Sequence, residues 1–143
     1  TIAVNLSGAF NCSKEAIAQM IELKYGAIVN ISSVAGLRAF SNRTSYNSSK
    51  YGLIGLSDSL AIDYATSNIR VNTICPGYIQ TDFVTNFFKS IGKRNFRKIV
   101  NSHLMKRLGK IEEVSNAVLF LLSDEASFIT GVKLPVDGGY MLG

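Results

Sequence analysis

The sequence contains two cysteines and one histidine, which excludes two common ways of stabilising a small domain. Cys12 and Cys75 lie far apart, no paired-cysteine motif is present, and His103 stands alone. A disulfide framework and a zinc site are therefore not expected, and we predict no metal ligands. We expect both cysteines to be small core residues in a reducing compartment, which indicates the cytoplasm. We expect His103 to be exposed to water.

Long apolar runs are absent as well. No segment approaches the run of about 18 apolar residues that a membrane-spanning helix needs, so we expect no membrane partner. Hydrophobic residues make up 47% and charged residues 17% of the 143 positions, which is ordinary for one globular domain. The chain starts with Thr1 rather than Met and is helical in pattern from its first residues. We therefore expect the natural N-terminus to lie further upstream.

Acidic residues are missing from one long segment. Residues 83–111 contain no acid, and eight of the 15 basic residues fall there. These are Lys89, Lys93, Arg94, Arg97, Lys98, Lys106, Arg107 and Lys110. We favour a solvated, mobile segment; the alternatives are attraction of an anionic substrate or of an acidic carrier protein. No nucleic-acid-binding motif accompanies the charge, so we expect no nucleic acid partner.

The pattern of apolar residues predicts helices and strands in alternation. Apolar residues recur at helical spacing near the N-terminus, and Gly26 is expected to end that first helix. The predicted order is a helix over 1–24, a strand over 27–31, a loop over 33–43, a helix over 44–66, a strand over 69–75, a polar segment over 78–110, a helix over 111–122 and a strand over 132–136. This alternation indicates an α/β fold with a parallel sheet, and Pro135 places the last strand at a sheet edge.

Tyr46 and Lys50 form the most informative pair in the chain. They are four residues apart in the predicted second helix, so both side chains lie on one helix face. Of the six tyrosines, only Tyr46 has a lysine at this spacing. A unit charge about 4 Å from a phenol supplies about 4 kcal/mol at an effective dielectric of about 20, which is the energy that a phenol needs to ionise near neutral pH. The pair therefore predicts acid–base chemistry.

The segments around this pair carry a family pattern. Residues 30–36 (NISSVAG) precede the pair, and residues 70–82 (RVNTICPGYIQTD) and 136–139 (VDGG) follow it. From Asn5 to Gly139 the chain resembles the short-chain dehydrogenase/reductase family in its motifs and in their spacing. The resemblance implies a Rossmann-like, doubly wound parallel sheet and an NAD- or NADP-dependent oxidoreductase. Such an enzyme interconverts a secondary alcohol and a ketone by hydride transfer.

The resemblance also implies a role for individual residues. Tyr46 matches the catalytic acid/base, and Lys50 matches the residue that activates the phenol and binds the nicotinamide ribose. Ser33 matches the hydroxyl that orients the substrate carbonyl, and Asn5 matches the position that holds a water in the proton relay. Pro76, Gly77, Ile79 and Thr81 match the segment that grips the nicotinamide carboxamide.

A Gly-rich dinucleotide loop between a strand and a helix is not found in this chain. By resemblance, that loop belongs to an N-terminal half of roughly 100 residues. We therefore interpret 1–143 as the catalytic C-terminal part of one Rossmann-like domain, with 78–110 as a flap over the substrate. The strand at 27–31 is expected to lack a partner on one side.

The resemblance narrows the subtype to two groups. The stretch from Lys106 to Tyr140 looks like both the 3-oxoacyl carrier-protein reductases and the sugar or polyol dehydrogenases. Carrier docking in such reductases uses basic residues; Lys24 is one candidate, whereas Ser67 stands where a second base would help. A homotetramer through the helices at 1–24 and 44–66 and the last strand is implied.

Sequence motifs for other functions are missing or incomplete. A hydrolase elbow needs Gly-x-Ser-x-Gly, and no such run exists. Ser90 and Lys93 have the spacing of an acylation motif but lie in the basic segment without partners. The alternative from another class is a truncated, non-catalytic interaction module of the same family origin. The missing cofactor loop favours that alternative, and the complete set of matched catalytic residues opposes it.

Overall fold

Three parallel strands form one sheet. The computed structural model describes residues 1–143 except for the side chains of residues 83 and 91. The strands are β1 (Gly26–Ile31), β2 (Ile69–Pro76) and β3 (Lys133–Val136), in the spatial order β1-β2-β3. Gly26 pairs with Ile69, and Thr73 pairs with Lys133. The predicted α/β fold with a parallel sheet is confirmed.

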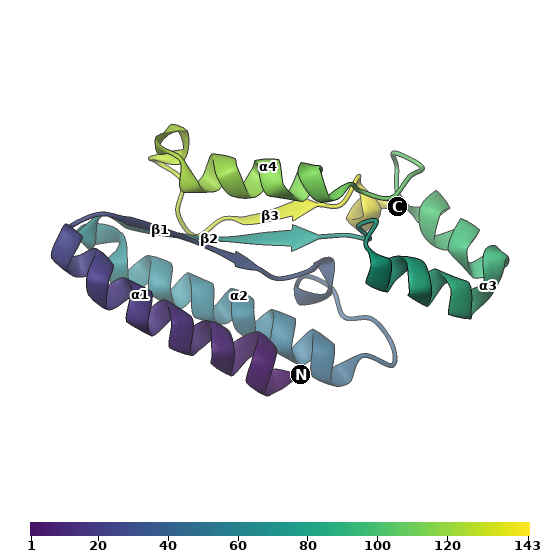
Figure 1. Cartoon of the computed structure of the whole chain (residues 1–143), viewed down its shortest axis with the longest axis horizontal. Coiled ribbons are helices and arrows are strands. Elements are labelled where there is room, and N and C mark those ends of the chain that lie inside the picture. Colours follow the sequence, from purple (N-terminus) through teal and green to yellow (C-terminus); the bar gives the residue numbers. More distant parts are fainter.

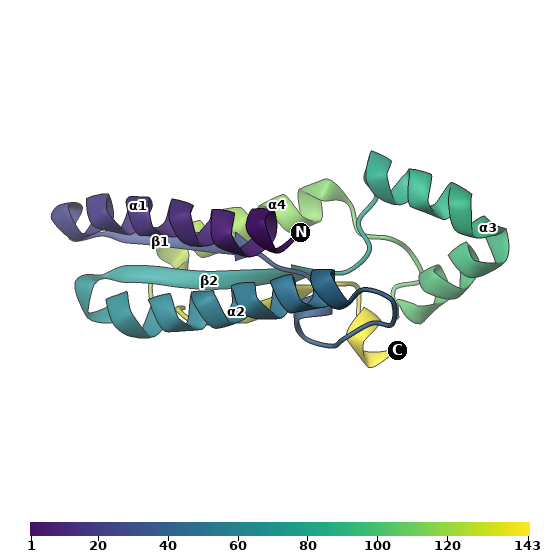
Figure 2. The ribbon, with the colours of Figure 1, turned by 90° about the horizontal axis from the view of Figure 1, so that it is seen from below.

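Helices cover both faces of this sheet (Figure 1). The short η1 (Ala3–Gly8) continues into α1 (Ala9–Leu23), and α1 and α2 (Thr44–Tyr64) lie on one face, with α4 (Ile111–Leu122) on the other. Viewed from below, α1 follows β1 and α2 follows β2 (Figure 2). The fourth long helix, α3 (Asp82–Ser102), stands beyond the carboxyl ends of the strands.

The helices on both faces of the sheet explain why β2 is buried. Ile69, Val71 and Ile74 are fully buried, because a central parallel strand with helices on both faces exposes neither side. Ile69 and Val71 pack with Ile17 of α1 and Ala61 of α2, whereas Ile74 packs with residues of α4 and its flanks. Two apolar layers, one on each face, therefore hold the strands in register.

The N-terminal helix differs from its prediction at both ends. It begins as a π-helix over Ala3–Gly8, and it ends at Leu23, where Lys24 takes a left-handed conformation with φ of 56°. The prediction that Gly26 ends the helix is wrong, since Gly26 already belongs to β1. Lys24 adopts the left-handed conformation although it is not glycine. Hydrogen bonds from its amide N–H to Met20 O and Ile21 O offset the cost of that conformation.

Cys12 also departs from the prediction, because it lies on the exposed side of α1, whereas Cys75 in β2 is buried.

The two sheet edges differ in character. Pro135 lies in β3, which has no further strand on its outer side in the described structure, as its sequence predicted. At the other edge, β1 has β2 on one side alone, and its last residue, Ile31, is 43% exposed. The prediction that the strand at 27–31 lacks a partner on one side is therefore confirmed for this chain.

The segment at 78–110 contains one interrupted helix, α3, and its two ends are hydrogen-bonded to each other. Gly92, with φ of 77° and ψ of 160°, interrupts α3 and turns its second half against the first. At the base, Ile79 forms a parallel bridge with Gly109. The Gln80 amide donates to Gly109 O at 2.8 Å, and the Gly109 amide donates to Tyr78 O at 3.0 Å. Both ends of the flap are thus held together, and its closure over a substrate stays a prediction.

Candidate active site

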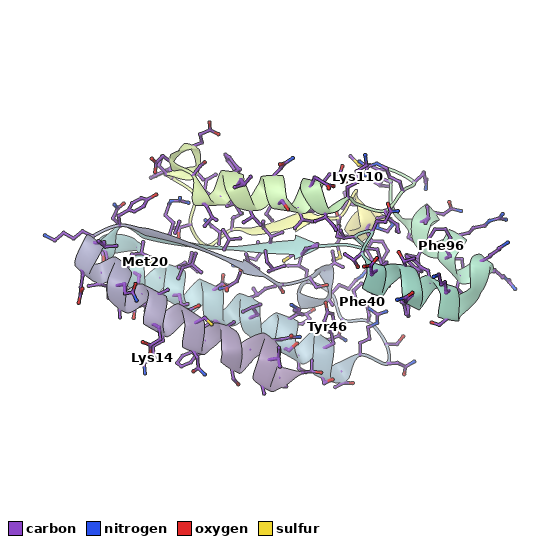
Figure 3. The ribbon with its side chains drawn as sticks, in the orientation of Figure 1. Lys14, Met20, Phe40, Tyr46, Phe96 and Lys110 are labelled. Carbon is purple, nitrogen blue, oxygen red and sulfur yellow. The ribbon has the colours of Figure 1, made fainter. Side chains whose placement is uncertain are left out.

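Tyr46 lies in the first turn of α2, at the carboxyl ends of the strands, on the side where α3 stands (Figure 3). Open parallel sheets bind ligands at this end of their strands. The Lys50 ammonium lies 5.8 Å from the centroid of the Tyr46 ring. The helical spacing therefore places a cation against the phenol, as predicted.

Lys50 is held by the end of β1. Its Nζ donates a hydrogen bond to Ile31 O at 2.9 Å, and Ser32 Oγ donates to Lys50 O at 2.9 Å. Burial lowers the pKa of the Lys50 ammonium below its ordinary value. An ammonium has three donors, and the bond to Ile31 takes one of them. The remaining donors are available to a ligand.

Asn5 reaches the same helix through a buried serine. Asn5 Nδ2 donates to Ser49 Oγ at 3.1 Å, and Ser49 Oγ donates to Tyr46 O at 2.8 Å. Ser49 is fully buried. The π-turn of η1 positions Asn5, and single π-turns occur often at functional sites. The link fixes the first turn of α2, and sequence reasoning missed it because Asn5 and Ser49 are 44 positions apart.

Ser33 starts a tight turn beside the helix. Its Oγ accepts the Ala35 amide at 3.1 Å and so caps a single 3-10 turn, Val34–Gly36. A Cβ on Gly36 would lie 2.6 Å from Ser32 Oγ and 2.7 Å from Lys50 O, so this turn can press against α2 only because position 36 is glycine. The close packing of this turn on α2 leaves Ser33 and Tyr46 in the wall of the same cavity.

Ser33, Tyr46 and Gly77 line one cavity of about 390 Å³. Its wall is mostly apolar. The lining residues belong to the turn that follows β1, the loop before α2 and the first turn of α2, the segment after β2 and the first half of α3. The lining residues are Ser33, Val34, Ala35, Phe40, Arg43, Tyr46, Gly77, Tyr78, Val84 and Phe87. Lys50 and Asn5 are not among these lining residues.

The predicted cofactor segment after β2 lies against the C-terminal strand. The Gly77 amide donates to Val136 O at 3.1 Å, and a Cβ at Gly77 would lie 3.0 Å from Asp137 Cα. Thr81 caps α3, since its Oγ1 accepts the Val84 amide at 3.2 Å. Pro76, Ile79 and Thr81 are near the cavity in sequence but are not among its lining residues, of which Gly77 is one.

An aromatic cluster closes one side of this region. The Tyr78 ring lies 5.5 Å from that of Tyr140 and 5.8 Å from that of Phe88, and the Tyr140 ring lies 6.0 Å from that of Phe40. Burial is the main cause that raises the pKa of the Tyr140 phenol. Asn47 Nδ2 donates to Phe40 O at 2.7 Å, which fixes the loop that carries Phe40.

His103 belongs to this cluster, so the prediction that it is exposed to water is wrong. It is 1% exposed, its ring lies 4.8 Å from that of Tyr140, and its Nδ1 lies 2.8 Å from Ile99 O. A carbonyl oxygen only accepts, so Nδ1 carries the proton. The sequence could not show this burial, because Tyr78 and Tyr140 come from distant segments. Among the described side chains, no three His, Cys, Asp or Glu residues gather as a metal site.

The fold and the cavity define a class of protein: a Rossmann-like α/β protein with a Ser, Tyr and Lys group at the carboxyl ends of its strands. Residues 1–141 match the family model described as "Enoyl-(Acyl carrier protein) reductase". The chain belongs to the short-chain dehydrogenase/reductase family. The resemblance stated from its motifs is therefore confirmed.

A curated relative has a similar sequence but is longer. A 3-oxoacyl-[acyl-carrier-protein] reductase FabG of Buchnera aphidicola is 42% identical over 138 residues, which are 96% of this chain and 55% of the relative. The chain thus spans about half the length of the curated relatives that it matches.

Solved structures of the family share the fold. ElxO with bound NADP superimposes with a TM-score of 0.89 at 35% identity, covering 97% of this chain and 56% of that one. A 4-hydroxyisoleucine dehydrogenase mutant complexed with NADH and succinate gives a TM-score of 0.91 at 37% identity, covering 99% of this chain and 58% of that one. Similar structures therefore hold either NADP or NADH. Within the described part of the chain, no helix is both long and apolar enough to cross a membrane.

Proposed function

We propose that this chain is the catalytic C-terminal part of an NAD(P)-dependent oxidoreductase that interconverts a secondary alcohol and a ketone. The observation that carries the proposal is the cavity shared by Ser33, Tyr46 and Gly77, with the Lys50 ammonium against the tyrosine ring. The names of the relatives, a 3-oxoacyl reductase and a hydroxyisoleucine dehydrogenase, support carbonyl and alcohol chemistry.

Tyr46 is the acid/base of this reaction. In reduction its hydroxyl donates a proton to the carbonyl oxygen, and in oxidation its phenolate accepts the proton of the hydroxyl. Ser33 orients the same oxygen from across the cavity. When bound, the nicotinamide supplies or accepts the hydride. The proton and the hydride together convert the ketone to the alcohol.

Lys50 and Asn5 support the phenol. The Lys50 ammonium stabilises the phenolate, and its donors that Ile31 O leaves free bind the ribose of the cofactor. Asn5 contacts the first turn of α2 through Ser49, and we propose that this contact is the route by which Asn5 acts on Tyr46 from outside the cavity. We propose that it also positions the proton-relay water.

The segment after β2 fits a nicotinamide. Gly77 lines the cavity at a position where a Cβ would lie 3.0 Å from Asp137 Cα, a tight contact that glycine avoids. Pro76, Ile79 and Thr81 hold the carboxamide side, with the Thr81 hydroxyl still able to donate while it caps α3. A Gly-rich loop for the pyrophosphate is not in this sequence, so we propose that an N-terminal half of the same domain supplies it.

The partners follow from the family. We propose a small carbonyl or alcohol substrate, a homotetramer and a cytoplasmic location, with the acyl carrier protein as an alternative substrate carrier because of the FabG relatives. Residues 78–110 are proposed as the flap that closes over the substrate and excludes water.

Replacing the Tyr46 hydroxyl tests the proposed reaction. In the full-length protein, Tyr46→Phe should lower kcat by about 100- to 10,000-fold, because the positioned acid is lost, while the cofactor dissociation constant changes little. Tyr51→Phe is the matched control, since Tyr51 lies on the same helix and is 45% exposed. Steady-state kinetics and a cofactor titration measure both quantities.

The same measurements distinguish the proposed oxidoreductase from the alternative, a non-catalytic interaction module. If Tyr46→Phe keeps half of the wild-type kcat, the acid/base assignment is wrong. If the full-length wild-type protein binds neither NAD nor NADP, the chain belongs to a non-catalytic interaction module of the same family.

A further inference from the structure

Arg43 lines the cavity beside the proposed acid/base. Of the described residues in the wall, it alone carries a formal charge. It stands directly before α2, three residues ahead of Tyr46, so the two side chains leave the backbone about one helical turn apart. A cation at this place needs an explanation, because the proposed reaction already has its ammonium in Lys50.

The Arg43 guanidinium has no acidic partner among the described side chains. The ion pairs there join Arg107 to Glu113 and Lys133 to Asp58. Arg43 instead lies 5.6 Å from the ring centroid of Phe87 on α3. Stacking on a ring holds the plane of a guanidinium and leaves its N–H edge free to bind a planar anion.

We propose that Arg43 binds the carboxylate of the substrate, so that the ketone and alcohol are a short oxo acid and its hydroxy acid. The proposal rests on the proposed function, because it assigns the substrate class of the same cavity. A guanidinium binds a carboxylate through two parallel hydrogen bonds, and the apolar walls from Val34 and Val84 strengthen that attraction by excluding water. The volume of about 390 Å³ suits a small acid.

Arg38 supplies a matched control. Its guanidinium lies 5.3 Å from the ring centroid of Phe40 and 5.9 Å from that of Tyr140. It is exposed and is not among the residues that line the cavity. Arg38→Gln therefore removes the same charge from a residue outside the cavity lining, and it serves as a stringent control because Arg38, like Arg43, stacks on a ring of the cavity wall.

Binding of unreactive probes tests the assignment. We expect calorimetry on the full-length protein saturated with cofactor to show that butyrate binds more tightly than butyramide. Arg43→Gln should weaken butyrate by about 10- to 100-fold, the range for a hydrogen bond to a charged group, and Arg38→Gln should leave it within about twofold. Equal binding of butyrate and butyramide by the wild type, or equal losses in the two variants, would overturn the proposal. Tighter Arg43-dependent binding of butyl phosphate would overturn the carboxylate in favour of a phosphate.

Steady-state kinetics with oxo acids and their esters distinguishes a failure of the Arg43 contact from a failure of the proposed reaction. With 2-, 3- and 4-oxo acids and their methyl esters, the ratio of kcat/KM for the best acid to that for its ester should fall by about 10- to 100-fold in Arg43→Gln. An unchanged ratio refutes the carboxylate contact even if the enzyme is active. If no ketone is reduced, the proposed function fails, and the butyrate comparison still decides the role of Arg43.

Discussion

Arg70 is expected to be a main determinant of stability, although it lies far from the cavity. It stands at the start of β2 and is 8% exposed. Its guanidinium donates to Leu121 O at 2.7 Å and to Ser123 O at 3.0 Å, with longer contacts to Leu122 O at 3.4 Å and Ile129 O at 3.5 Å. The last carbonyls of a helix lack partners inside it and carry partial negative charge. Arg70 therefore caps the C-terminal end of α4 and ties it to the sheet.

Arg70→Met should lower the free energy of unfolding by about 3 kcal/mol. The two short bonds each contribute about 1.5 kcal/mol, the low end of the range for a charged donor, because removing the buried charge also removes its desolvation penalty. The methionine keeps most of the volume but leaves the carbonyls unsatisfied. Arg70→Lys should lose about half as much, since an ammonium cannot span the same carbonyls.

Urea unfolding of the full-length protein, followed by circular dichroism at one fixed protein concentration, measures this loss. Lys133→Met is the matched control, because it removes a cation from the neighbouring strand whose ion pair with Asp58 is more than one-third exposed on both sides. That control should change stability by less than about 1 kcal/mol. A loss below 1 kcal/mol in Arg70→Met as well would refute the reasoning that the helix end depends on this guanidinium.

Two further expectations concern charge near α3 and α4. The Glu113 carboxylate accepts two N–H bonds from Arg107 and one from the Lys110 amide, and these contacts lower its pKa from the ordinary 4.5 to about 2. Since the pKa is lowered on folding, the stabilisation is present above about pH 4.5 and is lost as pH falls toward 2, so the difference in melting temperature between wild type and Glu113→Gln should shrink across that window and stay flat above it. If the basic segment at 83–111 attracts an anionic substrate, KM should rise several-fold between about 20 and 200 mM salt, because the Debye length falls below about 8 Å. A flat salt profile would assign these charges to solvated surface alone.

The strands and the Tyr46–Lys50 pair could be predicted because their signals are local. The run Ala27–Ile31 is apolar at every position except Asn30, and a spacing of four residues fixes a helix face whatever else the chain does. The helix at 111–122 was predicted with its observed bounds, since Glu112 and Glu113 mark its first turn. Local chemistry and tertiary packing agree at these positions.

The features that sequence reasoning missed all depend on contacts between distant segments. The bond from Asn5 to Ser49 spans 44 positions, and the carbonyls that Arg70 reaches lie more than 50 positions away. Nothing within one turn of Arg43 shows that it lines a cavity, because Phe87 reaches it from another helix. Periodicity describes which face a residue occupies and says nothing about which other segment lies opposite that face.

Pro135 makes the two edges of the sheet unequal as partners for a further strand. Val132 O accepts the Thr73 amide and Val136 O accepts the Gly77 amide, so alternation along the strand turns the backbone of Pro135 outward. At the outward position an N–H would bond to an incoming strand, and proline has none. Pro135 therefore removes one backbone donor from the outer edge of β3, whereas β1 contains no proline. Of the two edges in the described structure, β1 is the one that can offer an incoming strand a full set of backbone donors, whether the N-terminal half or another chain supplies that strand.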